Sequence, residues 1–275
     1  MSLPLYLHQQ TREQSRASAA ETLLLWPVGA IEQHGPHLAV GTDWLTVSAL
    51  ADAVGQQVRG QVPITIAPPL PFGSSHHHLP FGGTMSLATE TYYRVLCDLV
   101  ESLIGDGYRR IFLLNGHGGN QELIQLVARD LALKHPVRIA AAGYWTIAWD
   151  ALVAENAHLP GRLPGHAGVF ETSVMLSQHP DLVQPVRPHR DNVPGTDPRA
   201  IFSRYRSEVH GSWQEIDGYT DSPDRATAEA GQRWFNAIVK SVAETVIDFA
   251  RQPLPARTTA SITPASITPA SRPPA

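Results

Sequence analysis

Short apolar runs alternate with helical patterns along most of this chain, and that alternation restricts the fold more than any other sequence feature. Each apolar run is followed directly by glycine, proline or asparagine. These runs lie at residues 22–28, 63–67, 111–114 and 137–142. Apolar residues three and four apart predict helices at residues 44–58, 89–104, 120–133 and 224–249. Because strands that alternate with helices form largely parallel sheets, the sequence predicts an α/β fold.

The length of the chain favours a single catalytic domain. Large α/β domains run to about 250 residues as one unit, and this chain has 275 residues. Its last stretch repeats Ser-Ile-Thr-Pro-Ala and holds prolines too frequently for a helix or an interior strand. We therefore expect one domain over residues 1–252 and a disordered tail over residues 253–275.

Composition and charge narrow the class of protein. With 43% hydrophobic and 17% charged residues, the chain resembles a soluble enzyme rather than a disordered protein. A net charge of -4, without a dense Lys/Arg run, argues against nucleic acid or a membrane as partner and favours a small molecule. No apolar run approaches the roughly 20 residues of a membrane span, and no signal-peptide pattern is present. The only cysteine, Cys97, is compatible with a reducing compartment, so we expect a cytoplasmic protein.

Polar residues follow the predicted strands, where parallel α/β sheets bind their ligands. After the first strand, Glu32 and His34 are two residues apart and point to the same side of an extended segment. Asp43 adds a carboxylate at the start of the next helix. After the third strand, glycines leave His117 accessible in a tight turn. No Lys followed by Ser or Thr accompanies this turn, which disfavours a phosphate-binding loop.

Two further histidine clusters complete the pattern. One surrounds His78 after the second strand, and the other holds His166 and Glu171 before an apolar helix. A lone histidine is more often a packed or surface residue than a ligand, but four polar clusters after successive strands favour metal binding. Imidazole and carboxylate suit zinc, manganese or iron. Metal-activated water would then attack a C–N bond, with His166, His78 or Glu171 as candidates for the general acid.

These clusters resemble the creatininase, or creatinine amidohydrolase, family. The resemblance rests on Glu-x-His-Gly-Pro-His at residues 32–37, Thr-Asp at 42–43 and Asn-Gly-His-Gly-Gly-Asn at 115–120. Supporting segments follow in order, at residues 73–84, 171–173 and 223–227. The resemblance implies a three-layer α/β/α domain, a binuclear metal centre, hydrolysis of a cyclic or linear amide, and a homo-oligomer, commonly a hexamer.

The resemblance also implies ligand roles for two divalent ions, zinc before manganese or iron. Glu32 and His117 would bind one ion, His34 would bind the second, and Asp43 would bridge both. Because these residues leave the second ion with too few protein ligands, we choose Glu171 to complete it.

Three positions depart from common family patterns. Members that act on creatinine have Glu where this chain has Gly119, which argues against creatinine as substrate. Relatives with the double-glycine turn include enzymes that deformylate a pyrimidine intermediate and enzymes that trim a modified peptide. His77 stands where many relatives have Glu, and Gly82 where they have Pro.

The sequence therefore predicts a metal-dependent amidohydrolase that acts on a cyclic amide or an N-formyl amide. Creatinine hydrolysis proper and a non-catalytic metal or small-ligand binding protein remain as alternatives. A serine acyl-transfer enzyme is disfavoured, because no Gly-x-Ser-x-Gly segment is present. Trp145, Trp149 and Trp213 are candidates to cover an organic ring, although each also suits an ordinary buried aromatic.

Overall fold

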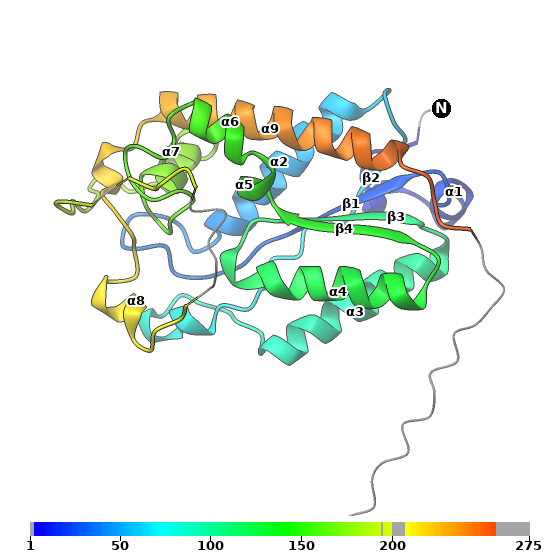
Figure 1. The fold of residues 1–275 in the computed structure, drawn as a ribbon, viewed down its shortest axis with the longest axis horizontal. Helices are drawn as coiled ribbons and strands as arrows, with labels where there is room; N and C mark the ends of the chain where they lie inside the picture. The colour runs from blue at the N-terminus through cyan, green and yellow to red at the C-terminus, as the bar shows by residue number, and fades with distance from the viewer. Residues whose placement is uncertain (1–2, 194, 200–206, 257–275) are drawn as a thin grey trace, which may run out of the picture.

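The computed structural model describes residues 3–193, 195–199 and 207–256 (Figure 1). In this described part, a parallel sheet of four strands has the order β2-β1-β3-β4. The strands are β1 (Leu23–Val28), β2 (Ile64–Ile66), β3 (Arg110–Asn115) and β4 (Arg138–Gly143). All residues of β1 are buried, as expected of a strand covered on both faces. The predicted parallel α/β sheet is confirmed.

Helices cover both faces of the sheet and make the three layers of the fold. Figure 1 shows α2 and α9 on one face and α3 and α4 on the other. These helices are α2 (Thr42–Val58), α3 (Thr89–Asp106), α4 (Gln121–Lys134) and α9 (Ala228–Arg251). Side chains of β1 alternate between the two layers, with Leu25 packed toward α2 and α9 and Leu24 toward α3 and α4. The three-layer α/β/α fold is therefore confirmed.

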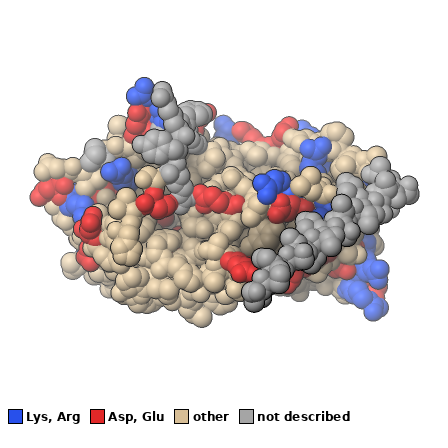
Figure 2. Space-filling model, turned by 60° about the horizontal axis from the view of Figure 1, so that its bottom comes forward, with Lys and Arg blue, Asp and Glu red and all other residues tan. Residues whose placement is uncertain are grey.

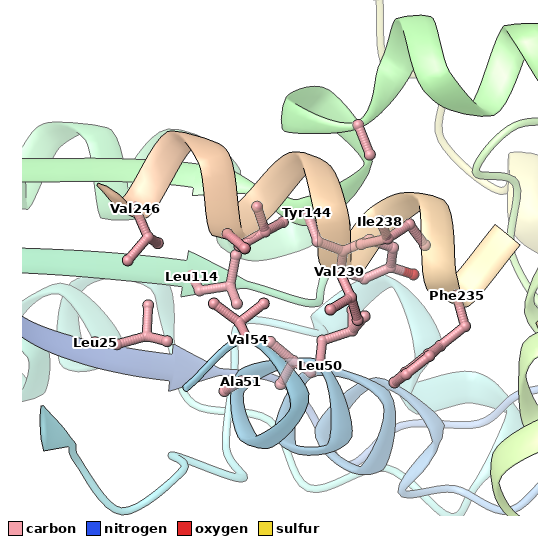
Figure 3. Close-up of a cluster of buried hydrophobic side chains, with 14 of the residues drawn as sticks. Leu25, Leu50, Ala51, Val54, Leu114, Tyr144, Phe235, Ile238, Val239 and Val246 are labelled. Atoms are coloured by element: carbon pink, nitrogen blue, oxygen red, sulfur yellow. The ribbon is translucent and has the colours of Figure 1, made fainter. Parts of the chain in front are cut away.

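The core between α2, α9 and the sheet holds the largest buried cluster. Leu50 and Val54 of α2 face Ile238 and Val239 of α9, and Leu114 of β3 lies between the two helices (Figure 3). Burial of each such side chain contributes about 1.5–3 kcal/mol. The cluster therefore holds α2, which carries Asp43 in its first turn, firmly against the sheet.

The helix predicted from residue 224 begins four residues later. Pro223 to Arg225 form a 3-10 turn, and α9 starts after Thr227, whose side chain accepts a hydrogen bond from the Ala230 N–H. This hydrogen bond is a normal N-terminal cap. The local cap, rather than the proline, therefore sets the start of the helix.

Short elements gather beyond the carboxyl ends of the strands, on the left of Figure 1. Of these, α7 (Val169–Gln178) carries Glu171 in its first turn, and α8 (Ser212–Glu215) carries Trp213. The remaining helices are α1 (Arg12–Ser18), α5 (Tyr144–Ile147), α6 (Trp149–Ala154), and the 3-10 helices Leu7–Gln9, His76–Phe81, Gly118–Asn120 and Pro180–Leu182. The end of the sheet where ligands were expected is therefore the most elaborated part of the fold.

The chain after α9 passes the amino ends of β3 and β4. Arg138 donates hydrogen bonds to the Pro253 carbonyl at 2.7 and 3.0 Å, and Arg109 donates one to the Pro255 carbonyl at 2.7 Å. The rest of the predicted tail, residues 257–275, lies outside the described residues. Within the described part, no helix combines the length and apolar character needed to cross a membrane. On the face in Figure 2, Lys and Arg side chains lie at separate positions among Asp and Glu.

Candidate metal centre

The register of the sheet brings the first and third polar segments together. Val28 of β1 pairs with Asn115 of β3, and the Gly116 N–H donates a hydrogen bond to the Val28 carbonyl at 2.8 Å. Both chains therefore leave the sheet side by side. The Asn115 carboxamide accepts the His117 N–H at 3.0 Å, and Asn120 donates to the Gly29 carbonyl at 3.0 Å. The two asparagines thus hold the turn that presents His117.

Gly119 permits a close backbone approach in this turn. A Cβ atom there would lie 2.2 Å from the Ser74 carbonyl oxygen and 2.5 Å from Nε2 of His117. Neither distance is possible for a real side chain. The turn therefore has no room for a glutamate side chain at this position.

Asp43 lies between two histidines and faces them with different oxygens. Its Oδ1 is 3.2 Å from Nε2 of His34, and its Oδ2 is 3.0 Å from Nδ1 of His117. Nε2 of His34 also lies 3.7 Å from Oε2 of Glu171. A carboxylate placed in this way could hold two neighbouring divalent ions.

Both of these histidines hold their other ring nitrogen against a backbone carbonyl. Nδ1 of His34 lies 3.1 Å from the Glu32 carbonyl oxygen, and Nε2 of His117 lies 3.1 Å from that of Ser74. Since a carbonyl only accepts, each of these nitrogens donates its hydrogen. In the neutral ring, the nitrogen that faces Asp43 then carries a lone pair, which is how metal-binding histidines are usually oriented, and without a metal a proton takes that place.

Glu32 is buried in a ring of imidazoles without a hydrogen bond to either carboxylate oxygen among the described residues. Its Oε1 lies 3.3 Å from Nδ1 of His117, 3.5 Å from Nδ1 of His166 and 3.6 Å from Nε2 of His78. A buried carboxylate without a hydrogen bond is costly. These residues fit a cation, which would satisfy the carboxylate and the lone pairs together.

The described residues contain three groups of possible metal ligands. Within each group, the ligand atoms all lie within 4.8 Å of one another. They are Glu32–His77–His117, Glu32–His34–His166 and His34–Asp43–Glu171. The last group is the set expected for the second ion. All five predicted ligands therefore come together with His78 and His166, the two histidines considered as general acids. His77 was not predicted as a ligand, although its place in a run of three histidines was a signal.

The buried carboxylates draw positive charge to the histidines between them. Burial opposes charge on His34, but the carboxylates of Asp43, Glu171 and Glu32 together raise the pKa of His34 to about 10. The pKa of His117 is likewise raised well above its usual value, against burial, by Glu32 and Asp43. Burial raises the pKa of Glu171 to about 8, and the charge of His34 opposes this shift. The cluster favours added positive charge, as a cation site should.

The pKa values of His78 and His166 shift in the opposite direction from those of His34 and His117. Burial, followed by the positive charge of neighbouring histidines, lowers the pKa of His78 to about 2 and that of His166 well below its usual value. Their rings stack with centroids 4.2 Å apart, and the Trp213 ring covers them at 4.7 and 5.3 Å. Both imidazoles are therefore held neutral.

A cavity of about 410 Å³ opens onto this cluster, a size suited to a small organic molecule. Trp145 and Trp213 line it together with Glu32, Asp43, His117 and Glu171. Trp149 belongs to the core, where its indole N–H donates to the Pro198 carbonyl at 2.8 Å. Of the three tryptophans considered from the sequence, two therefore border the cavity and the third is structural.

Comparison with known proteins agrees with this geometry. The family model described as creatininase, creatinine amidohydrolase, matches residues 8–246. Creatinine amidohydrolase of Pseudomonas putida is 30% identical over 251 residues, which cover 85% of this chain and 92% of that protein. The mycofactocin precursor peptide peptidase of Mycolicibacterium smegmatis is 33% identical over 227 residues, which cover 82% and 84% of the two chains.

Solved structures of creatininase have the same fold. One crystal structure of creatinine amidohydrolase superposes with a TM-score of 0.73 at 27% identity and covers 92% of this chain and 100% of its own. A mutant creatininase described as the Zn-Zn type has a TM-score of 0.73 at 27% identity and covers 91% and 100%. A structure described as creatininase Mn has a TM-score of 0.72 at 26% identity and covers 90% and 99%.

Proposed function

The chain belongs to the creatininase family, and from that membership we propose that its buried cluster holds two divalent ions for the hydrolysis of a small amide. The activity is that of a metal-dependent amidohydrolase. One observation carries the proposal: the two carboxylate oxygens of Asp43 face His34 and His117 separately. That division would let one carboxylate serve two ion sites.

We propose that each ion has its own protein ligands in addition to the shared Asp43. Glu32 and His117 would hold the first ion, and His34 and Glu171 the second. Zinc is our first choice and manganese or iron our second, because carboxylate and imidazole suit all three metals and related creatininase structures are described as Zn-Zn and Mn types. Bound ions of this kind lower the pKa of water and polarise a carbonyl group.

The surrounding chain orients these ligands. The Ala167 N–H donates a 2.6 Å hydrogen bond to Oε2 of Glu171, which fixes that carboxylate beside His34. The covering Trp213 limits the access of bulk water to His78 and His166, which remain the candidates for proton transfer to the departing nitrogen. These residues therefore supply orientation and a sheltered site.

The substrate class that we propose is a cyclic amide or an N-formyl amide. The cavity between Trp145 and Trp213 suits a small planar group, and the turn at Gly119 lacks room for the glutamate of creatinine-acting relatives. A hydrolysis screen of the zinc-loaded protein against creatinine, N-formyl amides, cyclic amides and short peptides tests this choice. Turnover of an N-formyl amide, or of a cyclic amide other than creatinine, above that of creatinine would support it. Tight zinc binding without hydrolysis of any amide would favour the non-catalytic alternative.

We further propose that the protein works in the cytoplasm as a homo-oligomer, with a hexamer as the expected form. The exposed apolar side chains of Leu79 and Met85 support an assembly, because association would remove them from water. The single free Cys97 is compatible with a reducing compartment. Light scattering on the purified protein would distinguish a hexamer from a monomer.

Removal of residues 257–275 is expected to leave the melting temperature and turnover unchanged, because we propose that the functional domain ends near residue 252. Thermal unfolding and an activity assay would check this. A longer deletion from residue 253 also removes the carbonyl acceptors of Arg138 and Arg109, and should cost about 1–2 kcal/mol of unfolding free energy. A large loss of stability after the shorter deletion would show that the domain boundary is wrong.

A further inference from the structure

Gln33 lies between two proposed ligands in the sequence, and its side chain contacts two imidazoles and two backbone groups. It is 7% exposed. The Gly35 N–H donates to its Oε1 at 2.9 Å, and its Nε2 donates to the Gly218 carbonyl at 2.9 Å. Because a backbone N–H only donates and a carbonyl only accepts, these two contacts settle which end of the amide is oxygen.

The amide nitrogen has one further hydrogen and two imidazole nitrogens within reach. Nδ1 of His78 lies 2.9 Å from Nε2 of Gln33, and Nε2 of His166 lies 3.0 Å from it. The His166 nitrogen is also 2.9 Å from the backbone carbonyl oxygen of Gln33. That carbonyl can only accept, so it is satisfied when Nε2 of His166 carries a hydrogen.

One assignment of hydrogens gives each acceptor in this set a donor, and it leaves two donors, Nε2 of Gln33 and Nε2 of His166, 3.0 Å apart. His166 donates from Nε2 to the Gln33 carbonyl, and the Gln33 amide donates its second hydrogen to Nδ1 of His78. If Nε2 of His166 were bare, two acceptors would face each other across 2.9 Å and Nδ1 of His78 would lose its donor. If Nδ1 of His78 carried a hydrogen, it would face the hydrogens of the amide. Buried polar groups avoid both arrangements.

We propose that Gln33 is a positioning residue that sets the tautomers of His78 and His166, so that the two rings present opposite chemistry to the cavity. His78 then presents an N–H at Nε2, and His166 presents a lone pair at Nδ1. Those two atoms lie 3.6 and 3.5 Å from the same carboxylate oxygen of Glu32. Gln33 therefore gives the two adjacent histidines different tautomers.

This assignment divides the work of the two candidate histidines, and this step rests on the proposed function. His166 is the ring that can accept a proton from the attacking water, forming an N–H bond at Nδ1 as an O–H bond breaks. It then passes that proton to the departing nitrogen as the C–N bond breaks, and its lone pair returns. His78 keeps its proton and donates a hydrogen bond to the oxygen of the reacting carbonyl.

Nitrogen-15 NMR of the zinc-loaded protein, with labelled histidine rings, tests the assignment directly. Signals are assigned with His78→Asn and His166→Asn variants. We expect His78 to be bare at Nδ1 and protonated at Nε2, and His166 to be protonated at Nε2. A proton on Nδ1 of His78, or a bare Nε2 on His166, would overturn the proposal. Because the wild-type spectrum requires no substrate, this result is separate from the success of the proposed function.

A Gln33→Leu variant provides the functional arm. We expect kcat to fall by about 100-fold with KM little changed, and the His78 signals to shift to a mixture of tautomers, because proton transfer of this kind contributes about 10²–10⁴-fold. Gln33→Glu keeps the shape but replaces the donor with an acceptor, and should not restore kcat. Gln10→Leu is the matched control, since it removes another amide that donates to a backbone carbonyl and a hydroxyl far from the cluster. Unchanged His78 signals in Gln33→Leu would contradict the role of Gln33.

Discussion

Replacement of Asp43 by alanine should remove both metal ions together and lower turnover by about 10³–10⁴-fold. This expectation follows because each oxygen of the Asp43 carboxylate faces a different histidine, so no single ion site survives its loss intact. Two bound ions contribute several kcal/mol to the stabilisation of a hydrolytic transition state, and each 1.4 kcal/mol is about a factor of ten in rate. Metal content measured by plasma mass spectrometry after dialysis, together with an amide hydrolysis assay, checks both parts.

The metal content of a His34→Ala variant is the control for the Asp43→Ala result. His34 faces Glu171 and one oxygen of Asp43, so its loss should mainly remove the second ion. Asp43 also stands in the first turn of α2, so Asp43→Asn is a second variant that keeps the shape of the helix start while weakening the ligand. If Asp43→Ala and His34→Ala lose the same single ion, Asp43 does not bridge two sites.

Glu171→Gln should remove the second ion and nearly all turnover while the first ion stays bound. The Glu171 carboxylate is buried with Oε2 only 3.7 Å from Nε2 of His34, and it belongs with His34 and Asp43 to one compact group of ligand atoms. The amide of glutamine keeps the shape and can still accept from the Ala167 N–H. It is a much weaker ligand than a carboxylate, so the loss of metal should exceed any loss of stability. Metal content and thermal unfolding of the same sample measure the two effects.

The rival role for Glu171 is a favourable charge at the start of α7. In that role Glu171→Gln would cost about 1 kcal/mol or less and leave the metal content unchanged. Glu229→Gln is the matched control, because Glu229 is also acidic and lies in the first turn of α9, away from the cluster. If the Glu171→Gln variant retains both ions, the second ion is instead bound by the group that contains His34 and His166.

The strands could be predicted closely because local signals define them. The run that ends at Val28 is apolar throughout and stops at Gly29, and the run before Asn115 stops in the same way. Parallel pairing then places Glu32 and His117 at the same edge of the sheet, so their meeting followed from the sequence as well. Periodicity and turn residues were sufficient for this part of the fold.

Contacts between distant segments could not be predicted in the same way. Trp213 covers His78 and His166 from a four-residue helix, and no local pattern indicates where so short a helix packs. The Gln33 contacts depend on Gly218, which is 185 residues away in the chain. Such pairs are set by how the loops beyond the sheet fold over one another, and spacing within one segment carries no information about that.

Titration of metal-free protein with zinc, with turnover of an amide followed at each step, tests the central claim most directly. Prolonged chelation should abolish hydrolysis, because ordinary water is not acidic enough to supply hydroxide at neutral pH. Activity should then return as zinc is added and level off at two equivalents per chain, with manganese or iron able to replace zinc. Full turnover in protein shown to be free of metal would contradict the account.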